Sequence, residues 1–351
     1  MNSKFWKDKR VLITGHSGFK GSWLSMILNS MGAEILGISS ESLNNNSELF
    51  KVLNIVNLVE SYDQDIRDPD KIMKIVSNFK PEIVFHLAAQ PLVRESYRLP
   101  VDTYEINIMG TINILEAIRA NDSVRSSLMI TTDKCYDNKE WIWGYRENDA
   151  MGGHDPYSSS KGCAELVIQS YQKSYFNNNS ISALSSARAG NVIGGGDLSQ
   201  DRLIPDIVRA IENNSKVSIR NPLATRPWQH VFEPLNGYLL VAEDLFNSGH
   251  QKNSSWNFGP LITDIRSVDE VTDLFCKTWG GLNIIEYDKE LQAHEATLLS
   301  LDISKAYHEL KWRPRWSLDE SMIHIVDWYK EYIAGGDLIS MSNSQIKSFF
   351  K

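Results

Sequence analysis

A tyrosine and a lysine four residues apart, Tyr157 and Lys161 in the segment YSSSK, have the types and spacing for proton transfer. On a helix such a pair lies on one face, one side chain above the other. A free tyrosine has a pKa of about 10 and is a poor base near neutrality, but a neighbouring ammonium and a positively charged nicotinamide favour the phenolate. The lysine can also hold ribose hydroxyls. The alternative for an isolated pair is a surface contact without chemistry.

The segment TTDKCYD at 131–137 follows an apolar run that predicts a buried strand. Ligands bind beside the carboxyl ends of strands in open α/β sheets, so these side chains border a candidate catalytic site. Thr132 offers a hydroxyl that can hold a sugar oxygen beside Tyr157, and Asp133 with Lys134 forms a titratable pair. The alternative is a surface turn in which the aspartate caps a helix.

A glycine-rich turn lies near the start of the chain, in VLITGHSGFKGSWL at 11–24, between a predicted strand and a predicted helix. Glycines let a backbone approach a pyrophosphate, and a helix N-terminus favours its negative charge. The spacing is G-x-x-G-x-x-G and differs from the G-x-G-x-x-G fingerprint, so a tight turn without a ligand is the alternative. The predicted cofactor loop consists of Gly15, Gly18, Phe19, Lys20 and Gly21.

Two further positions concern the choice between NAD and NADP. An acidic residue at the end of the second strand would hold ribose hydroxyls, whereas an arginine would suit a 2′-phosphate. This chain has Ser39, Ser40 and then Glu41 there, so NAD is favoured and NADP stays open. Asp65, in DQDIRD, can cap the adenine end of the cofactor or can belong to a solvated turn.

The elements that must position these residues alternate along the first half of the chain. Strands are predicted for RVLITG, AEILGIS, PEIVFHLAA and SSLMITTD, and helices for KGSWLSMILNSMG and PDKIMKIVSNF. This alternation indicates an α/β fold with a doubly wound parallel sheet of the Rossmann type. We expect residues 1–190 to form an NAD-binding domain, with a returning segment at about 229–258. Residues 191–351 should form mostly a smaller mixed α/β lobe that binds the substrate.

The composition is that of an ordinary globular protein. Of 351 residues, 42% are hydrophobic and 23% are charged, and no apolar run reaches the ~20 residues that a membrane span needs. The net charge of -8 argues against nucleic acid as a partner. Cys135, Cys163 and Cys276 lack metal-ligand spacing, so neither a metal site nor a disulfide framework is predicted, and a cytoplasmic location fits.

With these pieces assembled, the chain resembles the extended short-chain dehydrogenase/reductase family over nearly its full length, and within it the bacterial CDP-glucose 4,6-dehydratases. The matching stretches are GHSGFKGSWL, PEIVFHLAAQPLVRESY, TTDKCYDNKEWIWGYRENDAMGGHDPYSSSKGCAEL, RAGNVIGGGD, RPWQHVFEPLNGYL and WNFGP. The segments DKCYDNKEWIWGYRE and RPWQHV are long and uncommon, so this match is more specific than a generic Rossmann signal.

The resemblance implies a hydro-lyase that converts CDP-glucose to CDP-4-keto-6-deoxyglucose and water with a recycled NAD. Tyr157 would take the proton of the sugar 4-hydroxyl while C4 is oxidised; water would then leave across C5 and C6, and C6 would be reduced. Related dTDP-glucose dehydratases use an aspartate–glutamate pair for the elimination, and Asp133 and Lys134 match those positions. A lysine can act as base only if burial or a nearby cation lowers its pKa, so the division of roles stays open.

The resemblance also implies which other residues contact the ligands. The cofactor would be bound by Asp65, Ile66, Leu87, Ala88, Ala89 and Gln90, together with Tyr157 and Lys161. The sugar nucleotide would be held or supported by Asn107, Asn191, Arg202, Arg226 and His294. An arginine fork suits a diphosphate, although an isolated arginine is more often a surface charge. No side chain specifies cytosine, so the base of the nucleotide stays open.

Relatives pair through two helices per subunit, which predicts a homodimer through the segments around 101–120 and 158–176. Ile106, Met109, Ile112, Ile114 and Leu115 supply apolar surface for such a bundle, although the same residues can be buried within one subunit. The product would serve deoxysugar synthesis for bacterial surface polysaccharide, such as the O-antigen of lipopolysaccharide. Two other functions remain: a nucleotide-sugar 4-epimerase or a dehydratase for another nucleotide, and a non-catalytic NAD-binding regulator.

Overall fold

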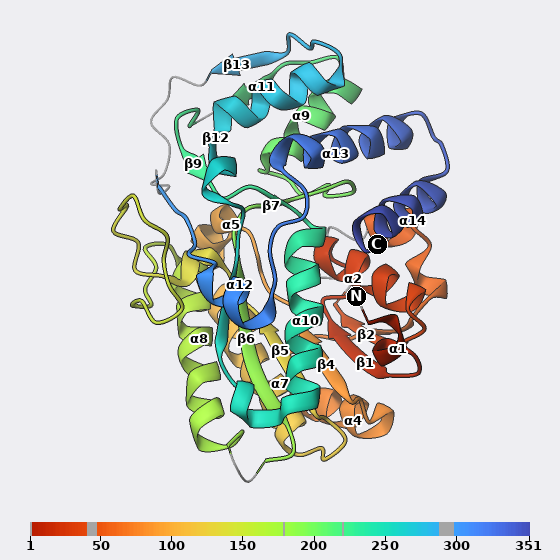
Figure 1. Ribbon diagram of the computed structural model, residues 1–351, viewed down its shortest axis with the longest axis vertical. Coiled ribbons are helices and arrows are strands. Elements are labelled where there is room, and N and C mark those ends of the chain that lie inside the picture. Colours follow the sequence, from red (N-terminus) through yellow and green to blue (C-terminus); the bar gives the residue numbers. More distant parts are fainter. Residues whose placement is uncertain (1, 41–47, 178–179, 220, 288–297) are drawn as a thin grey trace.

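The computed structural model describes residues 2–40, 48–177, 180–219, 221–287 and 298–351 (Figure 1). A parallel sheet of seven strands lies at its centre, in the order β11-β6-β5-β4-β1-β2-β3. Its strands are β1 (Arg10–Thr14), β2 (Glu34–Ser39), β3 (Glu60–Asp63), β4 (Ile83–His86), β5 (Ser126–Ile130), β6 (Ala183–Ala189) and β11 (Ser255–Phe258). The predicted Rossmann-type α/β fold is confirmed, and all four predicted strands lie in this sheet.

Helices cover both faces of the sheet because successive residues of a strand point to opposite sides. In β1, Leu12 packs into one apolar cluster, and Val11 and Ile13 pack into another. The Leu12 cluster includes residues of α4 (Pro69–Phe79), α7 (Gly110–Arg119) and α8 (Pro156–Ser174). The other cluster includes residues of α2 (Phe19–Ser30) and α10 (Phe232–Ser248). The two predicted helices are α2 and α4.

The start of α8 is fixed locally, and this start places Tyr157. Asp155 is the N-cap, and its carboxylate accepts a hydrogen bond from the backbone N–H of Ser158 at 2.9 Å. Pro156 occupies the first turn, where its missing N–H costs nothing. Gly153, just before the cap, has φ +139 and lies against the backbone of Ser158, so a side chain there would be strained.

The chain after β6 forms a second group of elements, which lies above the sheet in Figure 1. It contains three two-stranded sheets: β7 (Val192–Ile193) with β10 (Gln229–His230), β9 (Thr225–Arg226) with β12 (Arg266–Ser267), and β8 (Val217–Ile219) with β13 (Ile285–Tyr287). Its helices are α9 (Leu203–Glu212), α11 (Val268–Trp279), α13 (Leu318–Ile333) and α14 (Leu338–Phe349). Between these elements the chain returns to the central sheet through α10 and β11.

The remaining elements are short. They are α1 (Ser3–Trp6), α3 (Glu48–Val52), α5 (Val93–Arg98), α6 (Pro100–Tyr104), the π-helix η2 (Glu105–Met109), α12 (Ser304–Leu310), and the 3₁₀ turns η1 (Ile55–Asn57), η3 (Asp133–Cys135), η4 (Gly249–Lys252) and η5 (Ile262–Asp264). Within the described ranges, no helix is long and apolar enough to cross a membrane.

Candidate active site

The carboxyl ends of the parallel strands meet at one edge of the sheet, and the predicted site segments follow those ends. The strand order reverses between β1 and β4, since β2 and β3 lie on one side and β5 and β6 on the other. Such a switch point opens a crevice for ligands. The segments that follow β1, β4, β5 and β6 are residues 15–18, 87–90, 131–135 and 190–191. The fold therefore brings these four segments to the edge where a ligand would bind.

Tyr157 lies buried at this edge, with 8% of its surface exposed. Burial raises the pKa of its hydroxyl to about 12; a hydrogen bond with Thr132 opposes this rise, the Asp133 carboxylate adds to it, and the Arg202 charge opposes it. Without a ligand the phenol is therefore neutral near physiological pH. Additional positive charge is required before it can act as a base.

Lys161 supplies a positive charge one helical turn after Tyr157. Its side chain is 4% exposed, and Nζ donates a hydrogen bond to the carbonyl of Ile130 at 3.3 Å. Burial lowers the pKa of this amine to about 8, while the Glu165 carboxylate opposes the decrease. The lysine therefore stays mostly protonated near neutrality.

The Asp133–Lys134 pair lies in the turn η3, shortly after the end of strand β5. The Asp133 side chain is 1% exposed, and its Oδ1 accepts hydrogen bonds from Thr132 Oγ1 at 3.0 Å and Lys134 Nζ at 3.3 Å. Within the described part of the chain, Oδ2 of Asp133 is buried without a partner. Lys134 is 30% exposed and also reaches Asn191 Oδ1 at 3.4 Å. The site thus holds a carboxyl oxygen and an amine that are both available to a ligand.

The glycine loop after β1 fits the pyrophosphate of a dinucleotide. Gly15 has φ +74, and a Cβ there would lie 2.7 Å from the backbone nitrogen of Ala88. A Cβ on Gly21 would overlap the Gly15 carbonyl, so both positions require glycine. Gly18 is the N-cap of α2 and makes no side-chain capping bond, which leaves the first N–H groups of this helix to be satisfied otherwise. A phosphate is the ligand that such a helix start favours.

The end of β2 holds a serine–histidine network at the place where an acidic residue often binds ribose. His16 lies between Ser39 Oγ, at 3.0 Å from Nδ1, and Ser61 Oγ, at 2.7 Å from Nε2. Burial lowers the pKa of His16 to about 4, so this ring is neutral. Ser39 is therefore already engaged within the protein, and Glu41 lies outside the described residues.

Asp65 is occupied by a neighbouring arginine. Its carboxylate accepts three hydrogen bonds from Arg67, from the backbone nitrogen at 2.8 Å, Nε at 2.9 Å and Nη2 at 2.7 Å. Burial by itself would raise the pKa of Asp65, but these bonds lower it overall. This arrangement agrees with the alternative of a local turn. Ile66 is buried against Gly110 of α7.

The segment after β4 is held against α8 by a buried amide on η2. The side chain of Asn107 accepts a hydrogen bond from the backbone nitrogen of Gln90 at 2.9 Å. Its Nδ2 donates to the Gln90 carbonyl at 3.1 Å and to Ser160 Oγ at 2.9 Å. At the start of the segment, the backbone nitrogens of Leu87 and Ala88 donate hydrogen bonds to Thr14 of β1. The bonds of Asn107 are therefore made within the protein, which favours a supporting role.

The remaining predicted residues come from the second half of the chain. Arg202 precedes α9, pairs with Asp197 at 2.8 Å, and interacts electrostatically with Tyr157. Asn191 meets Lys134 as described above. Arg226 is buried on β9, where Nη1 donates to the Thr225 carbonyl at 2.9 Å. His294 lies outside the described residues.

A buried ion pair beneath the site was not predicted from the sequence. Arg188 Nη2 of β6 lies 2.7 Å from Glu165 Oε2 of α8, and both side chains are fully buried. Glu165 also accepts hydrogen bonds from Ser186 and Thr131, and Arg188 donates to Tyr136. One signal was present, because Glu165 follows Lys161 by four residues and therefore lies on the same helix face.

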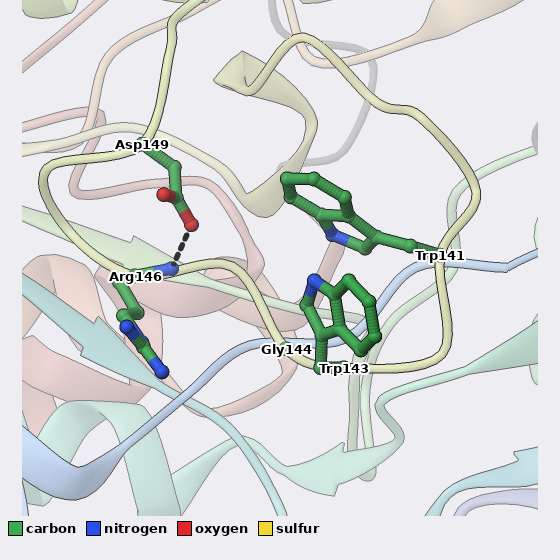
Figure 2. A pocket seen from close by; sticks show the side chains of 5 residues that line it. All are labelled: Trp141, Trp143, Gly144, Arg146 and Asp149. Atoms are coloured by element: carbon green, nitrogen blue, oxygen red, sulfur yellow. Dashed lines mark hydrogen bonds between the residues drawn. The ribbon is translucent and has the colours of Figure 1, made fainter.

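A small surface pocket of about 160 Å³ lies in the loop before α8 and is separate from these catalytic candidates (Figure 2). It is lined by Trp141, Trp143, Gly144, Arg146 and Asp149. The Arg146 backbone nitrogen donates to the Asp149 carboxylate at 2.7 Å, and the two tryptophan rings lie 5.5 Å apart. The uncommon sequence EWIWGYR thus forms a local aromatic surface.

Comparison with known proteins places this chain in a family. The family model for GDP-mannose 4,6 dehydratase matches residues 12–325. The chain therefore belongs to this family, which is part of the extended short-chain dehydrogenases/reductases. Among curated proteins, CDP-glucose 4,6-dehydratase from Salmonella typhimurium is 49% identical over 353 residues, covering 99% of this chain and 98% of that protein.

Solved structures share the fold at lower identity. A dTDP-glucose 4,6-dehydratase from Streptomyces venezuelae, solved with NAD bound, has a TM-score of 0.79 and 21% identity, with 94% of this chain and 99% of that chain covered. A UDP-glucose 4-epimerase from Thermotoga maritima, solved with UDP-glucose, has a TM-score of 0.80 and 22% identity, with 92% and 99% covered. Dehydratases and epimerases thus share one scaffold, and side chains in the site must distinguish them.

Proposed function

We propose that this chain is a hydro-lyase that converts CDP-glucose to CDP-4-keto-6-deoxyglucose and water, with NAD as cofactor. The observation that supports it most is the Asp133–Lys134 pair. Thr132 donates a hydrogen bond to Asp133, and both Thr132 and Asp133 influence the pKa of Tyr157. An elimination needs an acid and a base beside the oxidised carbon, whereas 4-epimerisation does not. The 49% identity with a CDP-glucose 4,6-dehydratase supports CDP as the nucleotide.

Each residue has a defined task in this proposal. NAD, when bound, supplies the oxidation at C4 and the later reduction at C6. Tyr157 takes the proton of the 4-hydroxyl, and Lys161 favours the phenolate by its charge. Once C4 is a ketone, the C5 proton is acidic and Lys134 removes it. Asp133 gives a proton to the C6 hydroxyl, which leaves as water.

We assign the ligands to two parts of the chain. Residues 1–190, with the returning segment at 229–258, would bind NAD through the glycine loop, Asp65, Ile66 and Leu87–Gln90. Residues 191–351 would bind mostly the sugar nucleotide. The residues assigned to the nucleotide sugar are Asn191, Arg202, Arg226 and His294, with Asn107 in support. Three free thiols fit a reducing cytoplasm as the location, and the deoxysugar would serve surface polysaccharide such as the O-antigen of lipopolysaccharide.

We also propose a homodimer formed by α6, η2, α7 and α8. Ile114 and Leu115 are fully buried inside the subunit, so they cannot supply its contact surface. Met109 is 49% exposed and Leu166 is 56% exposed, and these two residues remain available. Light scattering at micromolar concentration should give the mass of two chains, and Leu166→Glu should give a monomer. A wild-type monomer at that concentration would refute the proposed dimer.

The function is tested by incubating purified protein and NAD with CDP-, dTDP-, UDP- and GDP-glucose. We expect the CDP sugar to react fastest and its product to have lost the mass of one water. NMR should show a ketone at C4 and a methyl group at C6. A C4 epimer with unchanged mass would support the epimerase instead, and preference for another nucleotide would correct the substrate. Binding of NAD without turnover of any sugar would point to the regulator.

A further inference from the structure

Two pairs of residues divide the proposed reaction between them. Tyr157 and Lys161, the oxidation pair, lie at the start of α8, and Asp133 and Lys134, the elimination pair, lie in η3. Both pairs must face the same sugar, because oxidation at C4 is what makes the C5 proton acidic. The position of η3 relative to α8 is therefore part of the catalytic geometry.

A fully buried arginine contacts both of these segments. Arg188 Nη2 lies 2.7 Å from Glu165 Oε2, and Glu165 follows Lys161 by about one turn of α8. Arg188 Nη1 donates a hydrogen bond to the Tyr136 hydroxyl at 2.7 Å, and Tyr136 is the residue directly after η3. The guanidinium is planar and rigid, so its two terminal nitrogens hold these partners in a fixed relative position.

The Tyr136 side chain is held by two further contacts. Its hydroxyl donates a hydrogen bond to Asn257 Oδ1 of β11 at 2.7 Å. Its ring stacks on that of Tyr145, with the centroids 5.1 Å apart and an angle of 19° between the planes. Buried hydrogen-bond networks of this kind rigidify the segments that they join.

The residues of this network are shielded from any ligand by the protein itself. The side chains of Arg188 and Glu165 are fully buried, and Tyr136 is 1% exposed. They therefore have no surface that a sugar or a cofactor could touch. Any effect of theirs on the reaction must pass through the residues that they hold in place.

We propose that Tyr136 is a positioning residue that, through Arg188, sets the place of the elimination pair relative to the oxidation pair. The proposal rests on the proposed function, because it concerns two successive steps of that reaction. Removing the Tyr136 hydroxyl should leave the oxidation pair in place, since Glu165 keeps its ion pair with Arg188. The elimination pair should lose its alignment, since η3 is no longer tied to the arginine.

The variant Tyr136→Phe removes the hydroxyl and keeps the stacked ring. In a single turnover of CDP-glucose by protein loaded with NAD, nicotinamide absorbance follows oxidation, and mass spectrometry of quenched samples follows the loss of water. We expect oxidation within about twofold of wild type and loss of water slowed about tenfold, since a displacement of about 1 Å can slow a reaction about a hundredfold. Nicotinamide absorbance should therefore persist longer than in the wild type.

The variant Tyr145→Phe is the matched control, because its ring belongs to the same stack. The Tyr145 hydroxyl donates to Asn138 Oδ1 at 2.9 Å and accepts from the Lys139 backbone nitrogen at 2.6 Å, so these bonds lie within the loop after η3. Each of the two variants should lower the urea midpoint. Only Tyr136→Phe should change the ratio of the oxidation rate to the rate of water loss, whereas a purely structural role would change this ratio in neither.

A second variant keeps the test decisive if Tyr136→Phe does not fold. Asn257→Ala removes the acceptor of the Tyr136 hydroxyl and should change the ratio in the same direction. A wild-type ratio in the variants at 136 and 257, or an equal change in Tyr145→Phe, overturns the proposal. A wild-type protein that dehydrates no sugar nucleotide would refute the proposed function and this inference with it. A wild type that dehydrates CDP-glucose, with unchanged ratios in the variants, would refute this inference alone.

Discussion

Replacing Lys134 with Met tests the residue that departs from the aspartate–glutamate pair of related dehydratases. The Lys134 amine lies 3.3 Å from Asp133 Oδ1 and 3.4 Å from Asn191 Oδ1, and its side chain is 30% exposed. Two long contacts of a partly solvated amine contribute about 1 kcal/mol to folding. The loss of a general base, in contrast, slows a reaction about 10²- to 10⁴-fold, which is about 3–5 kcal/mol of barrier. The turnover rates expected for the variant under the catalytic and the structural explanation therefore differ by more than tenfold.

We expect Lys134→Met to stop the reaction after the first oxidation. That step depends on Tyr157 and Lys161, which the change leaves in place. In a single turnover with CDP-glucose, nicotinamide absorbance should rise and persist, while little 4-keto-6-deoxy product forms. In deuterated water, recovered sugar should carry little label at C5, because removal of that proton is the step that the lysine would perform.

A nearby lysine provides the control for this measurement. Lys139 is 60% exposed and pairs with Asp137 at 2.7 Å, so Lys139→Met should leave both the transient absorbance and the labelling close to wild type. Full product formation with normal labelling at C5 by Lys134→Met would rule out the lysine as an essential base. The group that removes the C5 proton would then be Asp133 or a bound water.

Three other predictions test the site and its support. Tyr157→Phe should lower turnover about a hundredfold or more while CDP affinity by calorimetry stays within about threefold, and near-normal turnover would refute its assignment as base. Gly21→Ala adds a Cβ that overlaps backbone and should lower the free energy of unfolding by about 1–3 kcal/mol; Gly18→Ala, whose nearest contact is 3.4 Å, should cost less, and equal urea midpoints would contradict this. Glu165→Gln leaves the buried Arg188 charge uncompensated, so it should cost about 3–5 kcal/mol in urea unfolding; a loss below about 1 kcal/mol would count against the pair.

The fold was predictable because its signals are local. Strands that are buried on both faces appear as continuous apolar runs, and β1, β2, β4 and β5 have this pattern. The candidate catalytic residues follow strand ends or share one helix face, so their order along the chain already indicates that they converge. Thr132 and Tyr157 are an example, since the Thr132 side chain after β5 influences the pKa of Tyr157 at the start of α8.

The partners of the charged residues were not predictable in the same way. Whether Arg202 pairs with Asp197, or Arg188 with Glu165, depends on how segments far apart in sequence pack, and the hydrophobic pattern does not encode that choice. Lys20 was assigned to the cofactor loop from its position alone, and its neighbours in the second half of the chain appear only in three dimensions. What covers the apolar face of α7 was also not predictable, because helical periodicity does not indicate which element or subunit packs against it.

The direction in which the Asn107 side chain points depends on the number of residues in the π-helical turn η2 as well as on residue type. A π-helical turn contains one residue more than an α-helical turn, and each residue of an α-helix rotates the chain by about 100°. Deleting one residue between 105 and 109 would restore regular helix and turn this amide away from Gln90 and Ser160. The segment after β4 would then lose its tie to α8, although every side chain involved would still be present. The additional residue of η2 thus determines how the side chains of α7 are rotated about the helix axis relative to those of α6.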